Sequence, residues 1–566
     1  MTRHFLFPIL LGCALGACAS SGTHRELQKD LAPALASLSA DDLLEHVRVL
    51  ASDEFEGRGP GTGGDEKTVA YLVSQFRSIG LEPGNPDGSY VQRVPLMGFE
   101  TSSRVSFTTP GGTLELERLE DYVAISRLEH ADLAGLELVF VGYGTVAPEY
   151  GWDDYKDVDV RGKAIVMLVN DPPVPDAKDP AQLDAAMFRG KAMTYYGRWT
   201  YKYEIAKAKG AAAAILVHET GPAGYPWEVI SGSWGREGFD IAAPPSQGEA
   251  AADAHVPVES WIQRDVALKL CRESGLDFEQ LKRQALARDF HPVAFTGARA
   301  NFDCRAKIRN IESSNVVALR RGSHPDNKDE LIVLTAHWDH LGKDPSRAGD
   351  QVFNGALDNA SGTSALLELA QASMLVDPAR SILFLAVTAE EKGLLGSKYY
   401  AAHPLYPLAR TVANVNMDGL NPYGRTLDVV NIGQGFSTLD EIVARAASTQ
   451  GRRIEPDAEP EKGFYFRSDH FSFVKQGVPA LYAESGVEYR GRPEGWGRAQ
   501  RERYTAEDYH KPSDEIRGDW DLSGAMEDVA LYLRVAWGIS EADAWPEWKP
   551  GSEFKAVREA MLRAAR

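Results

Sequence analysis

Five runs of apolar residues in the second half of the chain have the length and continuity of buried strands. Between them, apolar residues recur every three or four positions, which is the spacing of one helix face. The clearest such stretch, SGTSALLELAQASML, follows Asp358. Alternating helices and fully apolar strands predict an α/β fold, with a mostly parallel sheet and helices on both faces. The five runs are SNVVALR, ELIVLTAH, SILFLAVTA, TVANVNM and VPALYAE.

Two helices are predicted near the start of this domain. In SADDLLEHVRVLAS, Ser39 can cap the helix and the Asp pair after it suits the positive end of the helix dipole. A glycine-rich loop then leads into a second helix with four apolar residues on one face. These are Val69, Leu72, Val73 and Phe76.

Residues 105–295 have a different pattern, in which β-type runs such as LELVFVGYG, KAIVMLVND and VPVESWI predominate. TYKYEIAKAKGAAAAILVHE predicts a helix that runs through Gly210 into another strand. We therefore predict a smaller β/α domain at 105–295, inserted between 30–104 and 296–545 of the main domain. Residues 546–566 are expected to form a C-terminal tail. The inserted domain has no obvious ligand cluster, and a lid or spacer without a binding role remains an alternative.

The chain starts with MTRHFLFPILLGCALGACASSG, a short basic start followed by an apolar core, which indicates a secretory signal too short for a membrane anchor. Its Leu-Gly-Ala-Cys ending resembles the lipobox of bacterial lipoproteins. That resemblance implies removal of residues 1–17 and acylation of Cys18. The protein would then be exported and anchored by lipid to the bacterial outer membrane, facing the periplasm or the exterior. An ordinary cleaved signal with an incidental cysteine is the alternative.

Composition excludes one class of partner. The formal net charge is -20, which argues against binding to nucleic acid. Apolar content of 43% and charged content of 25% are ordinary for a globular protein. Cys271 and Cys304 could form one disulfide in an oxidising compartment or serve as two buried apolar residues. The oligomeric state is not visible in the sequence.

Imidazole and carboxylate groups gather where the predicted strands end. His337, Glu390, Glu391 and Asp418 each follow such a strand, and ligands of open α/β sheets bind at those ends. Asp358 in GALDNASG and His510 in YHKPSDE come from loops. So many acidic groups in one place would repel each other unless a cation were present, and this mixture of ligands suits zinc. One bridging ligand and two further ligands for each metal would use five such groups, so the count favours two zinc ions.

Six segments occur in the order and rough spacing of the di-zinc aminopeptidase family, which also contains glutamate carboxypeptidase and the transferrin receptor. The inserted domain resembles the protease-associated domain through VFVGYG, DVRGKAIVMLVND and KAKGAAAAILVHE. The resemblance covers nearly all of the mature chain and implies a zinc-exopeptidase fold. The six segments are TAHWDH, GALDNASG, TAEEKGLLGS, NVNMDG, FRSDHFSF and YHKPSDE.

The resemblance assigns the metal ligands residue by residue. His337 and Asp418 would bind one zinc, Glu391 and His510 the other, and Asp358 would bridge both. It thereby implies an aminopeptidase that hydrolyses the N-terminal residue of peptide substrates, using a water bridged by the two zinc ions.

Three further residues receive roles from the resemblance. Glu390 would be the general base, and Tyr509 would donate a hydrogen bond to the oxyanion. Asp339 would accept the second ring N–H of His337 and so fix the ring. His340 is interpreted as local structure. Asp469, His470 and Asp514 have no firm role, and Asp514 could orient His510 or be an exposed loop residue.

Other functions remain open. Carboxypeptidase action would need a cation for the terminal carboxylate, and four basic residues lie near the site motifs. A receptor-like binding module would lack ligands or base, and all of them are present here. A glutaminyl-cyclase-like acyltransferase would use one zinc and lack the inserted domain. The four basic residues are Arg467, Arg490, Arg492 and Lys511.

Overall fold

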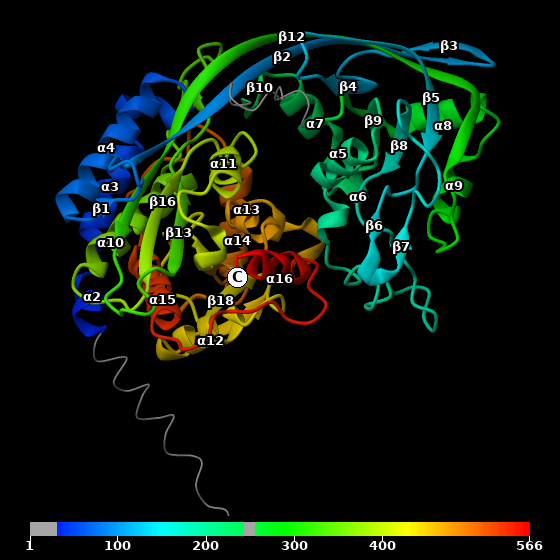
Figure 1. Cartoon of the computed structure of the whole chain (residues 1–566). Coiled ribbons are helices and arrows are strands. Elements are labelled where there is room, and N and C mark those ends of the chain that lie inside the picture. Colours follow the sequence, from blue (N-terminus) through cyan, green and yellow to red (C-terminus); the bar gives the residue numbers. More distant parts are fainter. Residues whose placement is uncertain (1–30, 243–254, 566) are drawn as a thin grey trace, which may run out of the picture.

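The computed structural model of the protein describes residues 31–242 and 255–565. Figure 1 shows two lobes joined by a long antiparallel ribbon across the top of the molecule. The ribbon consists of β2 (Val91–Thr109) and β12 (Val293–Arg320). We call the part formed by 31–90 and 314–565 the large lobe, and the part formed by 110–242 and 255–292 the small lobe.

The lobes share two continuous strands, although the sequence predicts domain boundaries within them. The breaks expected at 104/105 and 295/296 fall inside β2 and β12, since both strands pass unbroken from one lobe to the other. Their register runs from Val91 opposite Val316 to Thr108 opposite Arg299.

The large lobe contains the predicted sheet, with strand order β19-β18-β20-β17-β13-β16-β12. The inner pairs β16/β13, β13/β17 and β17/β20 are parallel, while β12 and β18 run antiparallel to their neighbours β16 and β20. The mostly parallel α/β fold is therefore confirmed. The strands are β13 (Leu331–His337), β16 (Ser381–Val387), β17 (Thr411–Asn416), β18 (Asp428–Ile432), β19 (Arg453–Pro456) and β20 (Ala480–Ser485).

Helices cover both faces of this sheet because its strands are apolar on both sides. Ile332 and Leu334 of β13 belong to one buried cluster with residues of the first helix group, and Val333 packs in another with the second group. The first group is α2 (Ala32–Ser37), α3 (Ala40–Leu50), α4 (Gly63–Ile79), α10 (Gly362–Ser373), α12 (Leu439–Thr449) and α15 (Ser523–Ser540). The second group is α11 (Leu395–Ala402), α13 (His470–Lys475) and α16 (Lys555–Ala564).

The two N-terminal helices form as predicted. The Ser39 side chain accepts a hydrogen bond from the backbone N–H of Asp42 at the start of α3. In α4, Leu72 and Phe76 are completely buried, and the helix ends at Gly80 with φ at +91°.

The sheet continues through β12 into the small lobe, where β5, β8, β9 and β11 are parallel and β4 is antiparallel to β11. Two apolar clusters, one of which includes the adjoining parts of β2 and β12, form its core. Cys271 and Cys304 are both free and buried in one of them. The elements are β3 (Gly112–Glu115), β4 (Tyr122–Ile125), β5 (His130–Phe140), β8 (Ala164–Leu168), β9 (Ala213–His218), β10 (Gly238–Ile241), β11 (Val258–Gln263), α5 (Trp199–Ala208), α6 (Thr220–Ala223), α7 (Trp227–Trp234), α8 (Arg264–Glu273) and α9 (Phe278–Gln284).

The helix α14 (Trp496–Glu507) follows β20 along the chain. Two local expectations need correction. Of the expected tail at 546–566, the described residues 546–565 are packed, since Trp548 and Phe554 are buried and α16 follows them. The helix α5 ends before Gly210, whose φ of +76° turns the chain toward β9.

The expected signal at 1–17 and the acylated Cys18 lie outside the described residues. Within the two described stretches, no helix combines the length and apolar character needed to cross a membrane.

Candidate metal centre

Three neighbouring strands end at the same edge of the sheet and bring most of the predicted site together. His337 is the last residue of β13 and pairs in register with Val387 of β16. Glu390 and Glu391 follow β16, and Asp418 follows β17, which pairs in parallel with β13. Parallel pairing places all of these side chains at one rim, as the sequence predicts.

Two loops complete the rim. Asp358 lies in the turn Ala356–Ser361 that leads into α10. The peptide bond between Asp358 and Asn359 is cis. His510 follows α14 and has a positive φ of 58°.

The Asp358 carboxylate lies between two groups of potential ligands. Its Oδ1 is 3.3 Å from Nε2 of His337, which is also 3.2 Å from Oδ1 of Asp418. Its Oδ2 is 3.1 Å from Nε2 of His510, which is also 3.2 Å from Oε2 of Glu391. Each oxygen of one carboxylate thus serves one group, which is the arrangement that a bridge between two ions requires.

The chemistry of these groups fits a cation. The buried Nε2 of His510 has no partner with hydrogen-bond geometry although two carboxylate oxygens lie within 3.2 Å. Nitrogen and oxygen atoms that lie close together without forming a hydrogen bond are suited to bind a common metal ion. Imidazole and carboxylate ligands together are characteristic of zinc.

Glu390 lies beside these groups. Among the described residues, its carboxylate forms no hydrogen bond or ion pair. Burial raises its pKa well above the ordinary value, and although His337 opposes this, Asp418 and Glu391 add to it. For Asp358, burial alone would raise the pKa, but His337 and His510 outweigh it and hold the pKa well below the ordinary value. Glu390 therefore binds a proton more readily than a free carboxyl group does, and Asp358 binds one less readily.

Asp339 differs from its expected role. The Nδ1 of His337 lies 3.2 Å from the backbone oxygen of Asp339, whereas the Asp339 carboxylate is 3.8 Å away. That carboxylate instead accepts the backbone N–H groups of Glu390 at 3.0 Å and Glu391 at 3.4 Å. Asp339 thus fixes the turn that carries both glutamates.

His340 and Asp514 make buried contacts at the rim. The Nδ1 of His340 lies 2.7 Å from Oε1 of Glu391, and His340 is completely buried with its other ring nitrogen unpaired. Asp514 is buried, and its carboxylate accepts the N–H groups of Leu357 and Asp358, each at 3.0 Å. It therefore positions Asp358 and not His510. The separation of Asp514 from Asp358 along the chain left no local signal for this contact.

Tyr509 stacks on His510, with ring centroids 3.8 Å apart. It is 44% exposed, so a substrate can reach it. Burial of part of the ring raises its pKa, and the nearby charge of Asp358 and Glu391 adds to this effect, so the phenol keeps its proton. Its proposed hydrogen bond to an oxyanion remains a prediction.

A chain of hydrogen bonds supports Asp418 from behind. Ser468 Oγ donates to Asp418 Oδ2 at 2.5 Å and accepts from Asn416 Nδ2 at 2.7 Å. Thr335 Oγ1 donates to Asn416 Oδ1 at 2.7 Å. Asp469, the next residue along, is buried and accepts the hydroxyl proton of Ser397 at 2.6 Å, so it acts as local support.

The Ser468→Ala variant is expected to bind zinc about 10-fold to 100-fold more weakly at one of the two positions, because Asp418 loses the donor that orients it. Titration with a competing chelator measures this affinity. Ser323→Ala, in a loop at the other end of β13, serves as a control. Unchanged zinc affinity in Ser468→Ala would show that the contact does not orient a ligand.

Arg58 is a buried cation that no sequence motif marks. Its guanidinium donates to the carbonyl oxygens of Trp338 (2.8 Å), Leu50 (2.7 Å), Asn354 (2.6 Å) and Gly355 (2.8 Å). Burial lowers its pKa to about 10, with Asp514 and Asp339 opposing this change. It holds α3 and the loops around His337 and Asp358 in one arrangement.

Arg58→Lys is expected to lower the free energy of unfolding by roughly 2–5 kcal/mol, since an ammonium group cannot satisfy four carbonyls that are spread around a planar guanidinium. Chemical denaturation followed by tryptophan fluorescence measures the loss. Arg48→Lys, on the exposed face of α3, is the matched control. An equal stability of both variants would contradict this role.

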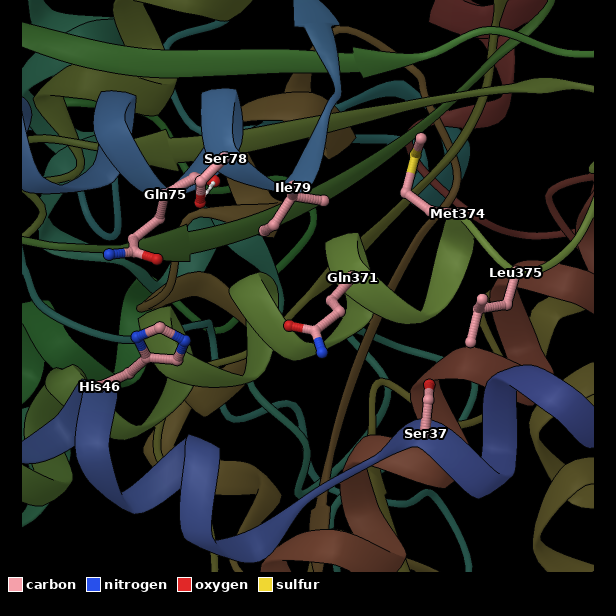
Figure 2. Close-up of a pocket in the computed structure, with 8 residues that line it drawn as sticks. All are labelled: Ser37, His46, Gln75, Ser78, Ile79, Gln371, Met374 and Leu375. Atoms are coloured by element: carbon pink, nitrogen blue, oxygen red, sulfur yellow. Dashed lines mark hydrogen bonds between the residues drawn. The ribbon is translucent and has the colours of Figure 1, made fainter.

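A pocket of about 380 Å³ lies elsewhere, where α2, α3, α4 and α10 meet (Figure 2). None of the predicted ligands lines it, and its one imidazole, His46, is 2.6 Å from the Tyr71 hydroxyl. The pocket is thus separate from the rim of potential ligands. Its lining residues are Ser37, His46, Gln75, Ser78, Ile79, Gln371, Met374 and Leu375.

Comparison with known proteins identifies the domain that carries this rim. Residues 315–534, which include every predicted ligand, match the model of peptidase family M28. This part of the chain is similar to peptidase family M28. It comprises most of the large lobe, and one of the curated relatives that it matches is a probable zinc metalloprotease.

Two curated relatives illustrate the similarity. Aminopeptidase YwaD of Bacillus subtilis is 36% identical over 238 residues, which are 40% of this chain and 46% of that protein. A glutamate carboxypeptidase 2 homolog of Caenorhabditis elegans is 31% identical over 208 residues, 34% of this chain and 24% of that protein. The chain thus spans less than half the length of either relative.

Among solved structures, the aminopeptidase from Aneurinibacillus sp. strain AM-1 is 19% identical to the chain and aligns with a TM-score of 0.48. The alignment covers 92% of this chain and 96% of that one.

Proposed function

We propose that the protein is a zinc-dependent aminopeptidase that hydrolyses the N-terminal residue of peptides with two zinc ions per chain. One observation carries the proposal: the two oxygens of Asp358 face two separate nitrogen and carboxylate groups. His337 and Asp418 would hold one ion, and Glu391 and His510 the other. The name of the Bacillus subtilis relative, aminopeptidase YwaD, supports this choice of reaction.

The mechanism follows from the groups on the rim. Zinc, when bound, supplies the positive charge that polarises the scissile carbonyl and acidifies water. Glu390 accepts the proton of the attacking water and passes it to the leaving amine. Tyr509 donates a hydrogen bond to the developing oxyanion. Asp339 and Asp514 keep the turns of Glu390 and Asp358 in place.

A comparison of peptides tests the reaction. Peptides with a free N-terminus are expected to be cleaved, and the same peptides with an acetylated N-terminus are expected to resist. Treatment with a chelator should abolish cleavage, and zinc should restore it. Cleavage that ignores the N-terminus but requires a free C-terminus would replace this proposal with a carboxypeptidase.

We also propose that the protein is exported and held on the outer membrane by lipid on Cys18, with the inserted lobe as a protease-associated domain. The N-terminal pattern supports the first part and the three β/α segments support the second. Labelling of cells with a radioactive fatty acid should mark the wild-type protein and spare the Cys18→Ser variant. Equal labelling of both would contradict the anchor.

A further inference from the structure

The strand β10 of the small lobe lies against the turn 389–395 of the large lobe, which carries Glu390 and Glu391. The strand pairs antiparallel with β2, and Figure 1 shows it beneath the ribbon. Its side chains Phe239 and Ile241 pack against a buried apolar cluster that contains both end residues of the turn. A strand of the inserted lobe therefore supports the segment that holds the predicted general base.

The backbone of this turn is strained near both ends. Ala389 and Leu394 have φ of 54° and 64°, in the left-handed region that residues with a side chain seldom adopt. The N–H of Leu395 donates to the carbonyl oxygen of Ala389 at 3.0 Å and closes the turn. Such conformations persist only where the surrounding structure holds them.

Two supports hold the turn in different ways. Asp339 holds its backbone, since the carboxylate accepts the N–H groups of Glu390 and Glu391. The strand β10 holds its side chains, because Ala389 and Leu395 are completely or almost completely buried in the cluster on which β10 packs. The first support belongs to the large lobe and the second to the small lobe.

The ring of Phe239 also joins the turn to the ribbon. The Lys392 Nζ atom lies 5.2 Å from the ring centroid, and the guanidinium carbon of Arg309 on β12 lies 5.7 Å from it. Both distances are within the range of cation–π attraction. Arg309 is itself fixed by Glu237, whose Oε2 accepts from its Nη2 at 2.9 Å. Phe239 thus contacts one cation of the turn and one of the ribbon.

The small lobe holds β10 through Asp240, which points to the opposite side from the two apolar side chains. Its Oδ2 accepts from Nε of Arg127 at 2.5 Å and lies 2.9 Å from Nε2 of His255. Both basic groups also contact Oε1 of Glu259 in β11, at 2.9 Å and 3.2 Å. Burial would raise the pKa of Asp240, but His255 and Arg127 outweigh it and lower the pKa, so the carboxylate stays ionised. The position of the small lobe is thereby passed to the turn.

We propose that Phe239 is a positioning residue that holds the turn of Glu390 from the small lobe. The inference rests on the aminopeptidase function proposed above, in which Glu390 is the general base. A base must stay within hydrogen-bond reach of the proton that it accepts, and a misplacement of about 1 Å can cost about 10²-fold in rate. The inserted lobe contributes to catalysis in this way and is more than a spacer.

Steady-state kinetics of Phe239→Ala at saturating zinc tests this role. The substrate is the best-cleaved member of a panel of dipeptide amides that differ in their N-terminal residue. We expect kcat to fall by about 10-fold to 100-fold while KM stays close to the wild-type value, because the base moves and the substrate contacts remain. Phe239→Leu fills part of the same space and should recover most of kcat.

A double variant shows whether the effect passes through the base. If Phe239 acts by placing Glu390, adding Phe239→Ala to Glu390→Gln should lower kcat no further. Losses that multiply in the double variant would contradict this route.

Two other variants separate positioning from general damage. Leu136 on β5 is partly buried against the core of the small lobe, so Leu136→Ala should lower the melting temperature and leave kcat unchanged. Asp240→Ala releases β10 from Arg127 and His255 and should lower kcat in the same direction as Phe239→Ala. It replaces Phe239→Ala if that variant does not fold.

The outcomes are distinct. Wild-type kcat in Phe239→Ala or its replacement, or a loss that appears in KM and not in kcat, would overturn the positioning role and leave the aminopeptidase in place. Equal losses of kcat in Phe239→Ala and Leu136→Ala would also overturn that role. Failure of the zinc-loaded wild type to cleave any member of the panel would overturn the proposed function itself.

Discussion

Replacing Glu390 by glutamine is expected to lower kcat by about 10²-fold to 10⁴-fold while both zinc ions stay bound. The amide has nearly the same shape as the carboxylate but cannot accept a proton from water. Because no described contact ties up the Glu390 side chain, its loss should leave the fold intact. Peptide hydrolysis and metal analysis of the same purified sample measure both quantities.

Two controls make this result specific. Glu115→Gln, on the exposed strand β3 of the small lobe, should retain full activity. Melting temperature and zinc content of Glu390→Gln should match those of the wild type. Wild-type kcat in Glu390→Gln would remove this residue from the role of base, and a loss of zinc would make it a ligand.

Asp358→Ala is expected to bind at most one zinc ion. Loss of a residue that only supports a metal ligand costs about 10-fold to 100-fold in activity, and Asp358→Ala should lose more than that. The alanine removes both oxygens that face His337 and His510, so each group of ligands loses one member. Metal content after dialysis against a weak chelator, together with peptide hydrolysis, measures the effect.

Asp358→Asn refines this test because it keeps one oxygen and removes the charge. We expect it to retain more zinc than Asp358→Ala and less than the wild type. Asp41→Ala, in the exposed first turn of α3, controls for the loss of an acidic residue elsewhere. Two zinc ions held at wild-type affinity by Asp358→Ala would exclude the bridge.

The sequence by itself determined the main fold. Runs such as ELIVLTAH and SILFLAVTA are apolar on both faces, so they can be buried only between two layers of helices, and β13 and β16 are found there. Parallel strands place their carboxyl ends together, which is why the order of residues along the chain was enough to group His337, Glu391 and Asp418.

Tertiary structure alone decided which groups support that rim. Arg58 contacts carbonyls of Asn354 and Gly355, and Asp514 contacts the N–H of Asp358, across long stretches of chain. Such hydrogen bonds join side chains to backbone groups that every residue carries, so they produce no recognisable sequence motif.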